Sequence, residues 1–220
     1  DAIAEFDWSV GEILKTLDRL KLADKTLIVL CSDNGPVLDD GYADGAVEKL
    51  GDHTPAGPFS GGKYSVFEGG TRTPFIVRWD GRVKPGVSDE VVCTVDLAAS
   101  FAALTGVSLP EQACLDSLNV LPALLGEGGA HGRDHLLQQD NNGMNLGLRM
   151  GEWKLVRMKN KGASQAVVTM KKRTESGGLH RLYHLTDDPA EEKDVSAQHP
   201  DRVKAMIAKM EEIVASGRTR

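Results

Sequence analysis

Six consecutive residues, Thr26–Cys31, form an unbroken apolar and β-branched run in this chain of 220 residues. Strands buried on both faces, as in parallel sheets, have this pattern. Ahead of the run, residues 1–20 repeat apolar side chains at steps of three and four, which predicts an amphipathic helix. A helix, a short polar turn and a buried strand together predict an α/β fold built on a mostly parallel sheet.

Two more strands and a helix are predicted before residue 108. Pro74–Trp79 predicts a second strand and Val91–Val95 a short third one. Asp96 is the expected N-cap of a helix that Gly106 closes. We therefore expect residues 1–108 to be one portion of the α/β domain.

From residue 109 onward the pattern changes to connecting loops and a small antiparallel β subdomain, residues 109–220. Short half-apolar runs separated by Gly and Asn predict its strands, at His135–Gln139, Leu146–Met150, Trp153–Met158 and Arg181–Leu185. Residues 159–178 form a polar, basic and mobile insertion in this prediction. A terminal helix begins at Pro200. Its expected inward side chains are Val203, Ile207, Met210 and Val214.

The charge and hydropathy of the chain argue against two classes of partner. The formal net charge is −6, which argues against a nucleic-acid partner or an anionic membrane surface. No apolar run approaches the roughly 20 residues that span a bilayer. We therefore expect no nucleic-acid partner and no membrane span.

Ser32-Asp33-Asn34-Gly35 follows directly on the predicted buried strand. Ligands of open α/β sheets bind outside the carboxyl ends of the strands. The side-chain oxygens of Asp33 and Asn34 suit a hard cation such as calcium or magnesium. On these four residues alone, an Asx-rich turn that ends the strand is the favoured alternative.

A long glycine-rich loop, residues 32–73, surrounds the next candidate. Loops of this length inside a compact domain tend to be functional. Lys63 follows two glycines and offers a compact cation with close backbone access to an anion. Glu68 is expected to be structural, because a free carboxylate repels an anion. Arg72 is expected to pair with a local carboxylate.

Taken together, these segments resemble the second half of the formylglycine-dependent type I sulfatases, in the alkaline-phosphatase-like superfamily. The motifs that carry the resemblance keep the family's order and spacing across residues 1 to about 210. They are Thr26–Val29, Ser32–Gly35, Gly62-Lys63, Glu68–Pro74, Asp96-Leu97, Asp116–Leu118, Arg149–Val156, Leu182–Leu185 and Asp188–Val195. The resemblance implies the carboxyl-terminal part of the family's mostly parallel sheet with flanking helices, a small antiparallel sheet and a terminal helix.

The resemblance also implies roles at matching positions. Asp33 and Asn34 are expected to be two ligands of one calcium ion, and Lys63 is expected to bind the sulfate group. His53, in Gly51–Pro58, is a candidate to contact the substrate or protonate the leaving-group oxygen. A surface histidine without a role is an equally weighted alternative at that position.

The family's nucleophile, a formylglycine made from Cys or Ser in Cys/Ser-x-Pro/Ala-x-Arg, has no match in these 220 residues. Two side chains also cannot supply the six or more oxygens of a calcium site. We therefore expect a fragment that is inactive alone, from a bacterial sulfatase acting on a sulfated carbohydrate or an aryl sulfate. By resemblance, the parent is expected to be periplasmic or extracellular.

Two other functions remain open. A phosphoesterase or phosphonate hydrolase of the same superfamily shares the sheet but normally binds two transition metals, for which an amide is a poor ligand. A non-catalytic structural or interaction module is the second. An isolated part of a sheet also exposes apolar edges, which predicts that Thr26–Cys31 is protected by self-association or by rearrangement of this chain.

Overall fold

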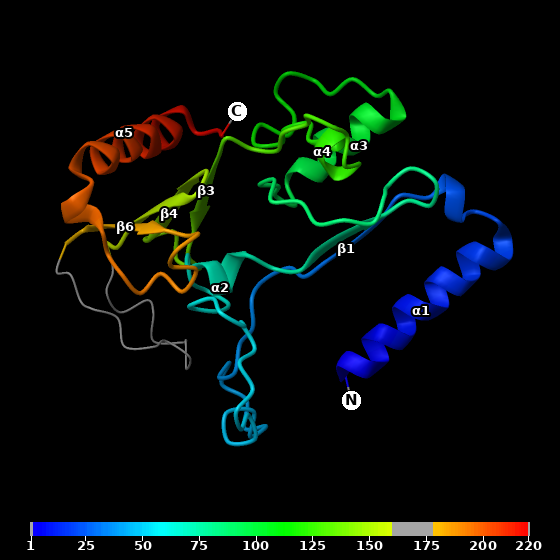
Figure 1. The fold of residues 1–220 in the computed structure, drawn as a ribbon, viewed down its shortest axis with the longest axis horizontal. Coiled ribbons are helices and arrows are strands. Elements are labelled where there is room, and N and C mark those ends of the chain that lie inside the picture. The colour runs from blue at the N-terminus through cyan, green and yellow to red at the C-terminus, as the bar shows by residue number, and fades with distance from the viewer. Residues whose placement is uncertain (1, 160–177, 220) are drawn as a thin grey trace.

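A computed structural model describes residues 2–159 and 178–219. The chain opens with helix α1 (Ala2–Leu20), a 3₁₀ turn at Ala23–Lys25 and strand β1 (Ile28–Cys31). A long loop leads to the short helix α2 (Glu68–Thr71) and strand β2 (Phe75–Arg78). In Figure 1 this loop, drawn in cyan, projects away from both sheets. None of the described helices is long and apolar enough to cross a membrane.

The second half of the chain contains the larger sheet. Helices α3 (Asp96–Thr105) and α4 (Leu121–Leu124) precede four antiparallel strands in the order β3-β4-β5-β6. The strands are His135–Gln139, Leu146–Met150, Trp153–Arg157 and His180–His184. A 3₁₀ turn at Ser196–Gln198 leads to the terminal helix α5 (Pro200–Ser216). The small antiparallel sheet and the terminal helix are confirmed, within one residue at each end.

Alternation along the strands buries both faces of the four-stranded sheet. One face packs against α5, which lies along the sheet in Figure 1. That cluster contains Leu146, Leu148, Leu155, Leu182, Met206, Met210 and Ile213. The opposite face holds a second cluster of Val66, Phe67, Val156, Tyr183 and Leu185. Because successive side chains of a strand point to opposite faces, residues 155 and 156 serve different clusters. The loop ahead of α2 is therefore part of the core.

Four expectations need correction. β1 is only half-buried and pairs with β2 in antiparallel register, Ile28 opposite Arg78. An apolar run indicates burial but does not determine whether the neighbouring strand is parallel or antiparallel. Both sheets of the described residues are antiparallel. Val91–Val95 is not a strand, because its backbone groups bond to Arg133 and Asp96. Val214 is exposed, since the inner face of α5 centres on Met206, Met210 and Ile213.

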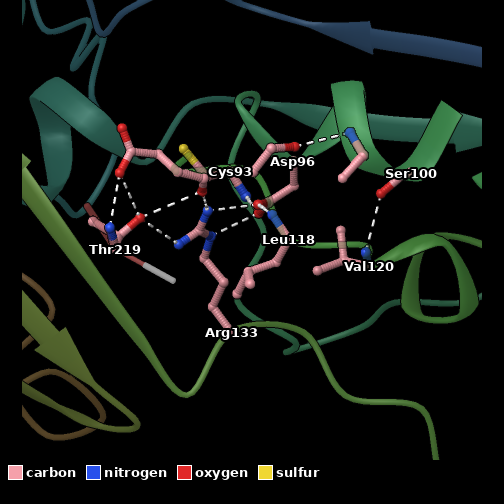
Figure 2. A network of polar contacts seen from close by, with 10 residues as sticks. Cys93, Asp96, Ser100, Leu118, Val120, Arg133 and Thr219 are labelled. Atoms are coloured by element: carbon pink, nitrogen blue, oxygen red, sulfur yellow. Dashed lines mark hydrogen bonds and ion pairs between the residues drawn. The ribbon is translucent and has the colours of Figure 1, made fainter. Parts of the chain in front are cut away.

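Asp96 also differs from its predicted role. Val95 is the N-cap of α3, and the Asp96 carboxylate accepts bonds from Cys93 N and Leu118 N, both at 2.9 Å. Arg133 donates to both Asp96 oxygens, at 2.7 and 2.6 Å, and to the carbonyl of Asp116. Figure 2 shows this network, which includes Thr219 at the end of the described chain. The buried pair thus ties α3 to the segment that leads into β3.

The apolar face of α1 is exposed. Figure 1 places α1 at one end of the molecule, with the β1–β2 ribbon between it and the larger sheet. The exposed large side chains of this helix are Ile3, Phe6, Trp8, Ile13 and Leu20. Self-association of the chain stays a prediction. The expected insertion at residues 159–178 falls almost wholly outside the described residues.

Two glycines give a paired test of the helix assignments. Gly106 ends α3 in the left-handed region at φ 70°, which any L side chain adopts only with strain. We expect Gly106→Ala to lower the free energy of unfolding by about 1 kcal/mol. Gly11 lies inside α1 with open space around an added Cβ, so Gly11→Ala should raise it by about 0.5–1 kcal/mol. Urea denaturation of both variants measures these changes; equal signs would contradict the assignments.

Candidate functional site

The loop after β1 is bonded directly to the glycine-rich segment. Gly35 N donates to Gly70 O at 3.0 Å, and Lys63 N donates to Pro36 O at 2.8 Å. Ser32 N donates to the carbonyl of Pro74 at 3.3 Å. These bonds flank the candidate metal ligands on both sides. Two segments that sequence analysis singled out separately are therefore neighbours in space.

Glycines are required where these segments cross. A Cβ added to Gly35 would lie 1.8 Å from Gly69 O, and one added to Gly70 would lie 2.3 Å from Gly62 O. Real Cβ atoms do not approach backbone atoms so closely, and no flexible side chain can move aside here. The backbones approach because glycine has no side chain. This packing fixes the distance between residue 34 and the Lys63 loop.

Asp33 and Asn34 lie at the end of β1 with oxygens available to a ligand. The Asp33 side chain is exposed, and no hydrogen bond or ion pair joins it to another part of the described chain. Asn34 is half-buried and its Nδ2 donates to Gly35 O at 2.8 Å, which leaves Oδ1 as the remaining acceptor. Ser32 Oγ donates to Asn34 O at 2.9 Å and holds the turn.

Lys63 lies next to a strained residue. Its Nζ is 5.3 Å from the centre of the Tyr64 ring, and it has no ion-pair partner within residues 2–159 and 178–219. Tyr64 has φ 76°, a conformation that costs on the order of 1–3 kcal/mol and clusters at functional sites. Tyr64 O accepts a bond from Asn141 N at 3.2 Å. The backbone around Lys63 is therefore held by bonds to two other segments, and its ammonium group has no carboxylate partner in the described part of the chain.

No contact among the described residues brings His53 to this cluster. Its side chain is exposed, and its backbone N donates to Leu50 O at 3.2 Å within the projecting loop. The structure thus joins the segments that carry Asp33, Asn34 and Lys63 and leaves His53 apart. The assignment of His53 to the substrate stays a prediction.

A buried ion cluster lies beneath the Lys63 loop, and of its members only Glu68 and Arg72 were predicted from the sequence. Lys154 Nζ is 2.7 Å from Glu68 Oε1 and 3.3 Å from Glu191 Oε1. Glu191 Oε2 accepts the backbone N–H of Glu68 at 2.7 Å. Arg72 lies 3.7 Å from Glu68. The structural role expected for Glu68 and the carboxylate partner expected for Arg72 are confirmed.

The pKa of Glu68 depends on two opposing effects in this cluster, burial and the charges of its basic neighbours. Burial by itself raises the pKa of Glu68, because it penalises the charged form. The charge and hydrogen bond of Lys154 outweigh burial and hold the pKa below its ordinary value of 4.5. The guanidinium groups of Arg149 and Arg72 lower it further. The carboxylate is therefore ionised in the folded chain.

This shift predicts a pH dependence of stability. The unfolded chain binds the Glu68 proton near pH 4.5, whereas the folded chain binds it only at lower pH. The free energy of unfolding should therefore fall as the pH drops below about 4.5, until the folded pKa is passed. Glu68→Gln should remove this part of the slope. Urea denaturation above and below pH 4.5 measures it, and identical slopes for both proteins would contradict the assignment.

The ligand set fits part of a hard-cation site. Carboxylate and amide oxygens are the donors that calcium prefers, and Asp33 and Asn34 present one of each. No group of three or more His, Cys, Asp or Glu side chains suited to a metal ion occurs in the described ranges. Calcium takes six to eight oxygens, so these two residues can supply only a share of its ligands.

The candidate metal ligands at the end of β1 and the candidate anion-binding lysine in the loop bonded to it are the arrangement expected in the class of proteins that bind anionic esters. Comparison with known proteins narrows this class. The family model described as Sulfatase matches residues 1–107. An N-acetylgalactosamine-6-O-sulfatase of Bacteroides thetaiotaomicron is 42% identical over 97% of this chain and 41% of its own length. A steryl-sulfatase of Rattus norvegicus is 39% identical over 57% of this chain and 21% of its own length.

A solved structure agrees with these relatives. A Bacteroides thetaiotaomicron sulfatase, described with the metabolism of multiple glycosaminoglycans, superposes with a TM-score of 0.82 at 40% identity. The match covers 94% of this chain and 42% of that one. The chain belongs to the sulfatase family. It spans less than half the length of the relatives it matches.

Proposed function

We propose that this chain is the carboxyl-terminal portion of a sulfatase that hydrolyses sulfate esters to an alcohol and sulfate. The observation that carries the proposal is the direct bond from Lys63 N to Pro36 O, at 2.8 Å. This bond joins the loop of Lys63, our candidate anion-binding lysine, to the loop that carries Asp33 and Asn34. We divide the chain at residue 108, a division that the family match over residues 1–107 supports.

Each candidate residue has a distinct task in this proposal. Asp33 and Asn34 would hold one calcium ion, which would supply positive charge to balance the sulfuryl oxygens. The Lys63 ammonium donates hydrogen bonds to a sulfuryl oxygen and stabilises the charge that grows as the ester bond breaks. His53 donates a proton to the leaving alcohol oxygen. A formylglycine nucleophile comes from outside these 220 residues, because none of them fits its motif.

We infer a sulfated carbohydrate as the substrate. The relative that is 42% identical over nearly the whole chain is named for N-acetylgalactosamine 6-O-sulfate. A steroid sulfate is the alternative, supported by a relative that matches only 57% of the chain. Release of sulfate from N-acetylgalactosamine 6-sulfate and from a steroid sulfate, measured side by side, distinguishes the two. For such a substrate we propose that the enzyme is exported and acts in the periplasm or outside the cell.

The test compares this chain alone with the full-length enzyme, meaning the chain preceded by the segment that carries Cys/Ser-x-Pro/Ala-x-Arg. The full-length enzyme should release sulfate from an aryl sulfate, lose activity with a chelator and regain it with calcium. The 220-residue chain should release none, because it lacks the nucleophile. Turnover by the chain alone would contradict the proposal, as would zinc in place of calcium in the purified enzyme.

A matched pair of aspartates isolates the metal site. Asp33→Ala should lower the calcium affinity of the full-length enzyme, because a carboxylate ligand is lost. Asp39 is also exposed, lies in the same loop and accepts a bond from Gly41 N at 3.2 Å. Asp39→Ala should leave calcium affinity unchanged. Equal effects of both variants would remove Asp33 from the ligand set.

A further inference from the structure

The four-stranded sheet lies beneath the candidate site. Val66 and Phe67, which follow Lys63 by three and four residues, are fully buried against Val156 and Tyr183. They lie on the face of the sheet that turns away from α5. Residues far apart in the sequence therefore form the floor of the Lys63 loop.

Three charged side chains extend this floor. Lys154 is 0% exposed, Glu191 is 0% exposed and Glu68 is 2% exposed. Lys154 is on β5 and reaches Glu68 at 2.7 Å across a sequence separation of 86 residues. Glu191 holds the backbone of Glu68 across 123 residues. One lysine thus joins the loop, the sheet and the segment after β6.

A short backbone path leads from Glu68 to the metal-ligand pair. Gly70 N donates to Phe67 O at 2.9 Å, which closes the turn around Glu68. Gly70 O accepts Gly35 N at 3.0 Å, and residue 35 directly follows Asn34. A displacement of Glu68 would therefore move Gly70, whose carbonyl group bonds to the loop that carries Asp33 and Asn34.

A second path leads from the same floor to Lys63. Gly69 N donates to Ser60 O at 2.8 Å, and Ser65 Oγ donates to Gly62 O at 2.9 Å. These bonds fold residues 60–65 back over the turn that follows them. Lys63 lies within this folded-back segment, and its backbone N–H donates to Pro36 O.

We propose that Lys154, Glu68 and Glu191 act as positioning residues, which hold Lys63 and the Asp33–Asn34 pair in one fixed arrangement. The assignment of catalytic tasks to Lys63 and the pair rests on the proposed function. The positioning itself rests on the buried contacts. Buried ion clusters add little net stability over apolar side chains of equal volume. Their directional bonds fix one geometry, which catalysis requires to within fractions of an ångström.

The Arg133–Asp96 pair supplies a matched control. It is equally buried, with side chains 1% and 0% exposed, and joins at 2.6 Å. It ties α3 to the segment before β3, and within the described residues it has no bond to the Lys63 loop. Glu68→Gln and Asp96→Asn each remove one carboxylate charge from a buried pair. Both should lower the Tm, but only the first should disturb the candidate site.

Amide hydrogen exchange in this chain tests the positioning without any catalytic assay. The amides of Gly35 and Lys63 are bonded across the two segments. In Glu68→Gln they should exchange at least about tenfold faster than in the unchanged chain, because the bonds open more often. In Asp96→Asn they should exchange at unchanged rates at a temperature where both variants are folded. Unchanged exchange at both amides in Glu68→Gln would overturn the proposal.

A kinetic readout in the full-length enzyme completes the test. Glu68→Gln should lower kcat by about tenfold or more, since small displacements of positioned groups cost much of the rate. Asp96→Asn should keep kcat. If Glu68→Gln fails to fold, Glu191→Gln replaces it, because an amide oxygen can still accept the Glu68 N–H. If Glu68→Gln lowers the Tm but leaves the amide exchange rates and kcat unchanged, the role of Glu68 is structural only.

The two proposals fail separately. If the full-length enzyme releases no sulfate from sulfate esters, the proposed function is wrong, and the exchange rates still decide whether Glu68 positions the loop. If Glu68→Gln leaves the exchange rates unchanged while Lys63→Met abolishes activity, the positioning is wrong and the proposed function stands.

Discussion

Replacing Lys63 by methionine in the full-length enzyme should lower kcat for sulfate-ester hydrolysis by about 10²–10³-fold. A charge-stabilising donor of an enzyme site is worth this much when removed. Lys63 has no ion-pair partner in the described part of the chain, so its charge is available to the substrate. Methionine keeps an unbranched side chain of nearly the same length and removes the ammonium group. Steady-state kinetics on an aryl sulfate measures the loss.

Lys49 provides the control for Lys63. It is in the same loop, is exposed and bonds through Nζ to Asp44 O at 3.0 Å. Lys49→Met should change kcat by less than about twofold, because surface substitutions away from special features have small effects. A Lys63→Met enzyme with kcat close to that of Lys49→Met would remove Lys63 from the site.

Replacing Lys154 by methionine should lower the free energy of unfolding by about 3–5 kcal/mol. The change leaves the carboxylates of Glu68 and Glu191 buried without the cation between them, and breaking a buried pair in this way has a cost of that size. For a chain of this length the loss corresponds to roughly 10 °C in Tm. Calorimetry of the 220-residue chain measures it.

The control for Lys154 is an exposed pair. Lys15 Nζ lies 2.8 Å from Glu12 Oε1 on the surface of α1. Exposed pairs of this kind contribute less than about 1 kcal/mol, so Lys15→Met should leave the Tm nearly unchanged. If Lys154→Met lowers the Tm as little as Lys15→Met does, protonation of the buried carboxylates or entry of water compensates for the missing ammonium group.

Periodicity predicted most of the secondary structure. Short alternating runs identified β3 to β6, and steps of three and four identified α1 and α5, because each pattern reports one buried face. The antiparallel pairing of β1 with β2 was missed, since the composition of a strand does not state the direction of its neighbour. The strand predicted at Val91–Val95 was wrong because the backbone N–H of Arg133 and the side chain of Asp96 bond to its backbone in place of a neighbouring strand.

The candidate site was predictable only where its residues are close in sequence. Asp33, Asn34 and Lys63 are in recognisable short motifs, whereas Lys154 and Glu191 contact Glu68 across 86 and 123 residues. One signal for Lys154 was present. Lys154 is two residues before Val156 and therefore points to the same face of β5. Because β5 is buried on both faces, a lysine at this position requires a buried partner.

One measurement tests the central claim most directly. The full-length enzyme is assayed with an aryl sulfate and an aryl phosphate that share the same leaving group, with calcium present. A sulfatase site with one hard cation beside Lys63 predicts a kcat/KM for the sulfate ester at least about 10²-fold above that for the phosphate, a difference of roughly 2.7 kcal/mol in transition-state stabilisation. Faster hydrolysis of the phosphate ester would contradict the account and favour a phosphoesterase.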